Sequence, residues 1–131
     1  MKNTIFKLLE YSYYFSLLIL FVLYLFPGSL IGYLLYGNLG EQPDLISNPI
    51  GTSINHLIYF SWLTFLALII KYRVKSIFSN IYIIFLISIF LEISHLIIPN
   101  RAFEYFDLFA NILGVLLVVA IKKLIRWPNS F

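Results

Sequence analysis

Residues 103–125 read FEYFDLFANILGVLLVVAIKKLI. A helix needs about 20 mostly apolar residues to cross the hydrocarbon core of a bilayer, and this run is long enough. Similar runs occupy residues 5–26, 52–70 and 77–98, and the polar segment 37–51 separates the first two. The sequence therefore predicts an all-α integral membrane protein, a bundle of four transmembrane helices.

The composition favours a membrane protein over a soluble domain. Of the 131 residues, 61% are hydrophobic and 11% are charged, and the mean hydropathy of +0.92 lies well outside the soluble range. No linker rich in proline, serine or glycine divides the chain, so we expect one domain over residues 1–131. The chain has no cysteine, which excludes disulfides, thiolate metal sites and a cysteine nucleophile.

The first apolar run, residues 5–26, has a signal peptide as its competing interpretation, because lysines near its start would form a basic leader. The run is too long for that, and no small-x-small cleavage site follows it. Pro27 and Gly28 break it instead. We expect a retained helix, followed by a short apolar segment at the outer interface, residues 29–36.

The distribution of lysine and arginine predicts the orientation. In a four-helix scheme, eight of the nine cations fall on one side, which the positive-inside rule assigns to the cytoplasm. These eight are Lys2, Lys7, Lys71, Arg73, Lys75, Lys122, Lys123 and Arg126. We expect a multi-pass protein of the cytoplasmic membrane with both termini in the cytoplasm. Because the cations flank apolar runs and form no stripe, nucleic acid is not expected as a partner.

Polar side chains within the apolar runs gather toward the predicted outer side. An ionisable group in a bilayer costs a few kcal/mol, so such groups are usually paired and functional. At a rise of about 1.5 Å per residue, Glu92, Asp107 and Asn111 lie about 6 to 12 Å below the outer ends of their helices. The candidate ligand-binding residues are His56, Tyr59, Glu92, His95, Arg101, Asp107 and Asn111.

Spacing places these groups on facing helices. Asp107 and Asn111 are four residues apart and share one helix face, as Glu92 and His95 do on the preceding helix. The hairpin between the two helices is short, so we expect antiparallel neighbours. Arg101 in that hairpin is within reach of a carboxylate, and a buried carboxylate needs such a partner. The sequence predicts a polar pocket open to the outside.

One pattern extends over the second to fourth runs: His56-x-x-Tyr59, Glu92 and Arg101-x-x-Glu104-x-x-Asp107-x-x-x-Asn111-x-x-Gly114. It resembles the VanZ-like family of small polytopic bacterial membrane proteins. The chain departs from that family at His95, where glutamine is usual, and at Val118, where a second glycine is usual. The resemblance implies a protein of the bacterial inner membrane and cell envelope, without a settled biochemical activity. It implies functional roles for His56, Tyr59, Glu92, Arg101, Asp107 and Asn111.

Glu92-x-x-His95 also has the spacing with which helical bundles hold di-metal centres. Such a centre needs a second pair of this kind and further carboxylates, whereas only His56 and Asp107 are obvious additional ligands. We therefore expect neither a metal nor another cofactor.

The candidate residues leave several interpretations open. Structurally, Arg101 with a carboxylate could pin a hairpin, and Asn111 could join helices at Gly114. Functionally, we expect binding of a membrane lipid or lipid-linked envelope precursor, because arginine, histidine and tyrosine can meet phosphates and sugar hydroxyls. The alternatives are an accessory subunit of a larger membrane protein complex, or an enzyme that acts on a head group through a carboxylate beside a histidine.

Overall fold

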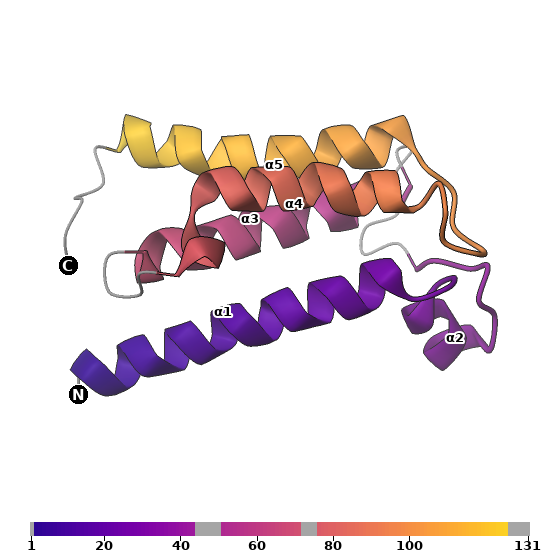
Figure 1. Ribbon diagram of the computed structural model, residues 1–131, viewed down its shortest axis with the longest axis horizontal. Coiled ribbons are helices and arrows are strands. Elements are labelled where there is room, and N and C mark those ends of the chain that lie inside the picture. Colours follow the sequence, from indigo (N-terminus) through magenta and orange to yellow (C-terminus); the bar gives the residue numbers. More distant parts are fainter. Residues whose placement is uncertain (1, 44–50, 72–75, 126–131) are drawn as a thin grey trace.

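The computed structural model describes residues 2–43, 51–71 and 76–125 (Figure 1). These parts of the chain are all-helical and contain no strand, which confirms the expected all-α class. In chain order the elements are α1 (Lys2–Leu25), α2 (Leu30–Tyr36), α3 (Ser53–Ile70), the 3-10 helix η1 (Ile77–Ser79), α4 (Ile81–Ser94) and α5 (Tyr105–Leu124).

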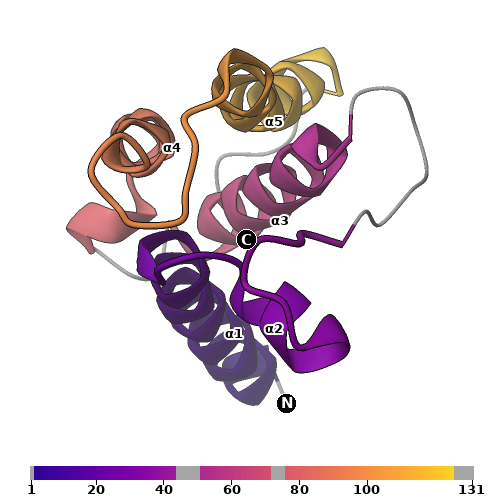
Figure 2. The ribbon, with the colours of Figure 1, turned by 90° about the vertical axis from the view of Figure 1, so that its right-hand side faces the viewer.

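The four longer helices run alongside one another, and α2 lies beyond the end of α1 (Figures 1 and 2). The most extensive helix contact joins α3 and α5. Gly114 makes this contact close, since a Cβ at that position would lie 2.7 Å from Leu57 O. The apolar core between the helices contains Tyr13, Leu17, Leu20, Tyr24, Phe60, Leu63, Leu66, Ala67, Ile70, Ile84, Leu91 and Val115.

Within the described residues, three helical segments are long and apolar enough to cross a membrane: Asn3–Leu25, Ser53–Ile70 and Tyr105–Leu124. The expected third run, residues 77–98, is divided into η1, the 14-residue α4 and a series of turns. α4 begins where the Asn80 side chain accepts a hydrogen bond from Tyr82 N–H. At about 1.5 Å per residue α4 is about 21 Å long, shorter than a hydrocarbon core of about 30 Å. Helix length and composition alone therefore support three of the four expected crossings.

The outer surface of the bundle is apolar. Large hydrophobic side chains are exposed on each of the four longer helices, for example Phe15, Trp62, Phe90 and Phe109. Soluble monomers rarely expose contiguous apolar patches of such extent. This surface and the long apolar helices are typical of a protein embedded in lipid.

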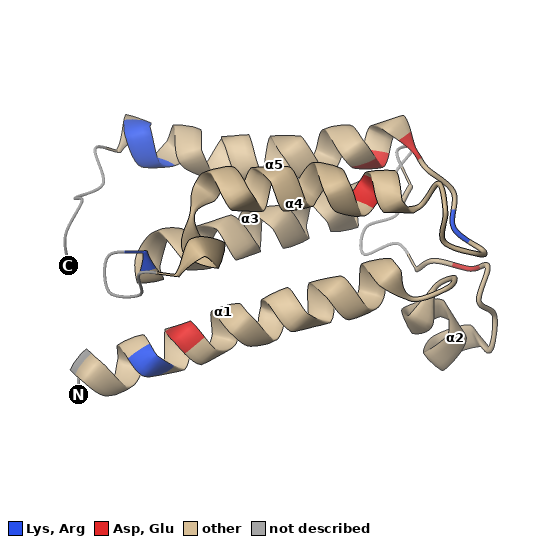
Figure 3. Ribbon diagram, viewed as in Figure 1, with Lys and Arg blue, Asp and Glu red and all other residues tan. Residues whose placement is uncertain are grey.

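Charged side chains lie mainly near the two ends of the bundle (Figure 3). One end, where α1 begins and α3 and α5 finish, carries Lys7, Lys71, Lys122 and Lys123. The opposite end carries Arg101 together with the carboxylates Glu41, Glu92, Glu104 and Asp107. Arg73, Lys75, Arg126 and the side chain of Lys2 lie outside the described residues. The described cations other than Arg101 thus share one end, the arrangement from which the orientation was predicted.

The short apolar segment 29–36 forms α2, which packs against the loop that follows it. Ser29 Oγ accepts a hydrogen bond from Gly32 N–H at 2.9 Å and begins the helix. A Cβ at Gly32 would lie only 1.6 Å from Glu41 O. The loop backbone therefore rests directly on α2, and both contribute to one pocket of the protein.

Candidate functional site

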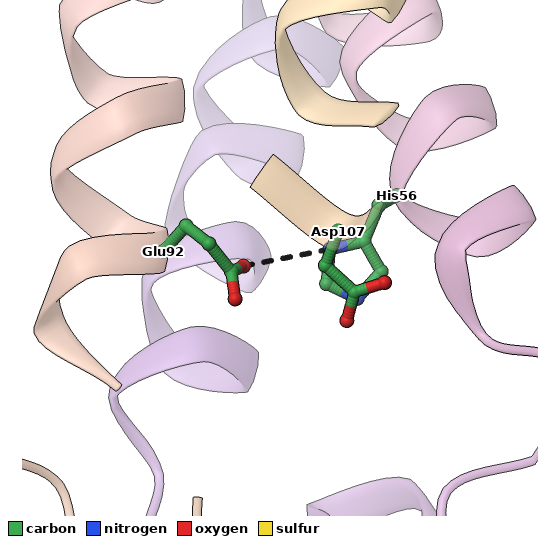
Figure 4. Close-up of side chains that lie close together, drawn as sticks. All are labelled: His56, Glu92 and Asp107. Carbon is green, nitrogen blue, oxygen red and sulfur yellow. Dashed lines mark ion pairs between the residues drawn. The ribbon is translucent and has the colours of Figure 1, made fainter. Parts of the chain in front are cut away.

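Three buried ionisable side chains converge near the end of the bundle that carries the α4–α5 hairpin: His56 of α3, Glu92 of α4 and Asp107 of α5 (Figure 4). His56 Nε2 lies 3.3 Å from Asp107 Oδ2, and His56 Nδ1 lies 3.9 Å from Glu92 Oε2. His95 Nδ1 lies 3.3 Å from Glu92 Oε1. The structure thus brings four of the predicted site residues into one buried cluster.

A chain of hydrogen bonds orients His56. Asn111 Nδ2 donates to Ser88 O at 3.2 Å, which fixes the amide so that Oδ1 faces α1 and α3. The Tyr24 hydroxyl donates to that Oδ1 at 2.8 Å and lies 2.6 Å from His56 Nδ1. A hydroxyl has one hydrogen, so the Tyr24 oxygen accepts from His56 Nδ1–H. Asn111 therefore belongs to the site, with Tyr24 as the link between the two side chains.

The two carboxylates differ in their hydrogen bonds. Asp107 Oδ1 accepts from the Ser53 hydroxyl at 2.5 Å. Glu92 Oε1 accepts from Glu104 N–H at 3.3 Å. Glu92 Oε2 is buried and has no hydrogen-bond partner among the described residues. An unsatisfied buried polar group costs about 1–3 kcal/mol, so this oxygen marks a place where the cluster is incomplete.

Arg101 does not form the ion pair with a carboxylate that the sequence suggested. Its guanidinium donates to the backbone oxygens of Leu23 and Phe26 at the end of α1, and to Gln42 Oε1 at 3.4 Å. Carbonyls at the end of a helix lack partners within the helix, so a cation there is favourable. Burial lowers the pKa of Arg101, and the charges of nearby Tyr24, Glu92 and Asp107 act in the opposite direction.

A pocket of about 490 Å³ lies beside the cluster, between α1, α2 and the start of α3. Its polar lining comprises Tyr24, Ser29, Gln42, Asn55, His56, Tyr59, His95 and Arg101. Its apolar lining comprises Leu20, Leu23, Leu30, Ile31, Leu35, Tyr36 and Pro43. The hydroxyl of Tyr59 donates to Ser16 O of α1 at 2.8 Å. Glu92 and Asp107 contact His56 but do not line the pocket, so the cluster and the pocket meet at His56 and His95.

Sequence reasoning missed Tyr24, Ser53 and Ser88. The first apolar run has no ionisable group near its outer end, so it contributed no candidate residue, although Tyr24 bonds to the cluster. A tyrosine buried near the end of an apolar run needs a partner for its hydroxyl, and this could have indicated a role. Ser53 and Ser88 carry no comparable signal, because serines are common in such helices.

The family model described as VanZ/LLP1 matches residues 3–126 of the chain. This match confirms the resemblance and extends it from the second, third and fourth apolar runs to the first. Among curated proteins and among solved structures, nothing matches the chain.

Proposed function

The chain belongs to the VanZ/LLP1 family, and from that premise we propose that its pocket binds the head group of an envelope lipid or lipid-linked precursor. The protein would span the bacterial inner membrane four times. The observation that carries the proposal is the pocket between α1, α2 and α3, whose lining combines polar groups with apolar side chains of α1 and α2. A lipid offers the same two parts, a polar head group and an apolar chain.

The charges around the pocket suit an anionic or hydroxyl-rich group. Arg101, His56 and His95 line the pocket, whereas Glu92 and Asp107 do not. A guanidinium has five N–H donors, and three of the Arg101 donors bond to α1 and Gln42. No bond within the described residues uses the other two, which could donate to a phosphate oxygen.

The test is the lipid retained by protein purified in mild detergent, measured by mass spectrometry after extraction. We expect the wild type to retain a specific anionic or sugar-bearing lipid, and Arg101→Gln to retain about tenfold less, which corresponds to about 1.4 kcal/mol of lost binding. Lys7→Gln removes a cation at the opposite end and is expected to retain the wild-type amount.

Arg101 also holds the end of α1, so a second variant separates binding from folding. Leu35→Trp fills the apolar wall and leaves every polar lining residue in place, and we expect it to retain less lipid too. Equal retention by wild type, Arg101→Gln and Leu35→Trp would refute the proposal. Copurification of a second protein in stoichiometric amount, without lipid, would favour the accessory-subunit alternative.

The proposed topology rests on the basic end of the bundle facing the cytoplasm. Because the chain has no cysteine, single cysteines can report it. We expect Asn38→Cys and Asn100→Cys to react with an impermeant thiol reagent in intact cells, and Ser76→Cys to react only after the cells are opened. Labelling of Ser76→Cys from outside would contradict this orientation. If Asn38→Cys were labelled from outside and Asn100→Cys were not, the two positions would lie on opposite sides of the membrane, which would contradict four crossings.

A further inference from the structure

We propose that His56, Glu92 and Asp107 bind one divalent transition-metal ion between α3, α4 and α5 (Figure 4). One ligand atom from each residue can be chosen so that all lie within 4.8 Å of one another. The sequence argued against a di-metal centre, which needs more carboxylates than the chain supplies. A single ion needs only three protein ligands, with a further position left for water or a substrate.

Neutral His56 carries its proton on Nδ1, which leaves Nε2 as the nitrogen that can bind an ion. The hydrogen-bonded chain from Ser88 O through Asn111 and Tyr24 ends on His56 Nδ1 and places the hydrogen there. The other ring nitrogen, Nε2, then directs its lone pair toward Asp107. Histidines that bind metals are oriented in this way, with the second ring nitrogen donating to an outer partner.

The facing atoms of His56 and Asp107 have the separation expected of two ligands of one ion. His56 Nε2 and Asp107 Oδ2 are two electron-rich atoms only 3.3 Å apart, so a cation or a proton must lie between them. Metal–ligand bonds of about 2.0–2.2 Å in a tetrahedral site put neighbouring ligand atoms about 3.3 Å apart. The observed separation therefore accommodates an ion without movement of either helix.

Glu92 can supply the third ligand atom. Its Oε2 is fully buried, lies 3.9 Å from His56 Nδ1 and has no hydrogen-bond partner in the described parts of the chain. The Glu92 and Asp107 carboxylates lack an ion pair with any described lysine or arginine, because Arg101 bonds to α1 instead. Two buried carboxylates without a fixed cation favour the uptake of one.

The ligand set indicates the class of ion. Imidazole and carboxylate suit zinc, manganese and iron, whereas calcium and magnesium prefer oxygen ligands alone. His56 also lines the pocket, so an ion on its Nε2 would lie near the proposed head-group site. The metal proposal stands without the lipid proposal, since it rests on the three side chains and their hydrogen bonds.

The experiment is equilibrium dialysis of chelator-treated, detergent-purified protein against Zn²⁺, with the bound metal measured by elemental mass spectrometry. We expect one equivalent of zinc on the wild type. Asp107→Asn and Glu92→Gln keep the side-chain shape and are expected to bind at least about tenfold more weakly. Glu41→Gln is the matched control, because it neutralises an exposed carboxylate at the same end and outside the cluster, and it should bind zinc as the wild type does.

A second measurement needs no variant. When up to one equivalent of Mn²⁺ is added to the chelator-treated wild type, the electron paramagnetic resonance signal of the free ion should be absent, because the protein binds the ion. Excess Zn²⁺ should displace the Mn²⁺ and restore that signal. Absence of binding by the wild type to both ions would overturn the metal site, as would unchanged zinc binding in both Asp107→Asn and Glu92→Gln. Lipid retention measured on the same samples distinguishes failure of this proposal from failure of the pocket.

Discussion

His56→Ala is expected to lower the free energy of unfolding of the metal-free protein by about 3–5 kcal/mol, since it leaves two buried carboxylates without their partner. Asp107 Oδ2 lies 3.3 Å from His56 Nε2, and Glu92 Oε2 lies 3.9 Å from His56 Nδ1. Removal of the ring also deprives the Tyr24 hydroxyl of its hydrogen-bond partner His56 Nδ1. The loss should therefore exceed that of an ordinary large-to-small change at a partly polar site.

The same reasoning predicts that the effects of neighbouring substitutions are not additive. Asp107→Asn in the His56→Ala background removes an unpaired buried charge, so the double variant should be more stable than the sum of the single effects predicts. Glu41→Gln is the control, because this carboxylate is exposed and lies outside the cluster, and its effect should add to that of His56→Ala. Reversible unfolding in mixed detergent micelles measures both cycles. Additivity of His56→Ala with Asp107→Asn would show that the two side chains do not interact.

Gly114→Ala is expected to destabilise the bundle by about 1–3 kcal/mol, the cost of overpacking a close contact. The added Cβ would lie 2.7 Å from Leu57 O and 3.1 Å from Phe60 Cβ. Backbone on both sides must move apart, because neither contact is with the tip of a flexible side chain. The strain falls on the contact between α3 and α5, which also sets the distance between His56 and Asp107.

Gly40→Ala is the matched control, because its nearest non-neighbouring atom is Asn38 Oδ1 at 3.5 Å, an ordinary contact. The thermal unfolding midpoint should fall for Gly114→Ala and stay near the wild-type value for Gly40→Ala. Gly114→Leu should be more severe, with loss of folded protein from the membrane fraction. If the unfolding midpoint of Gly114→Ala equalled that of the wild type, the close contact between α3 and α5 at Gly114 would be contradicted.

Residue spacing was sufficient to predict much of the polar cluster. Glu92 and His95 share one face of α4, and Asp107 and Asn111 share one face of α5, as their intervals of three and four residues required. Depth estimated from helix rise placed Glu92, Asp107 and Asn111 at one end of the bundle, and the structure has them near the end of α4 and the beginning of α5. Such arguments succeed because a helix has a fixed rise and a fixed angle per residue.

Spacing could not predict which helix lies opposite a given face. Arg101 has carboxylates nearby in the sequence, yet it bonds to Leu23 and Phe26 at the end of α1, more than seventy residues away. Tyr24 was missed among the candidate residues for the same reason, because its partners His56 and Asn111 belong to α3 and α5. Long-range partners depend on the packing of whole helices.

The sequence by itself determined the all-helical class, the family and the three long apolar helices, because each depends on composition, local motifs or the length of a run. The tertiary structure decided that residues 77–98 contain a short α4 capped by Asn80, that Arg101 caps α1, and that the carboxylates meet His56 away from the pocket lining. These features depend on which backbone and side-chain groups remain unsatisfied after the helices have packed. Local sequence fixes the direction of a side chain on its own helix, whereas its partner is supplied by another helix.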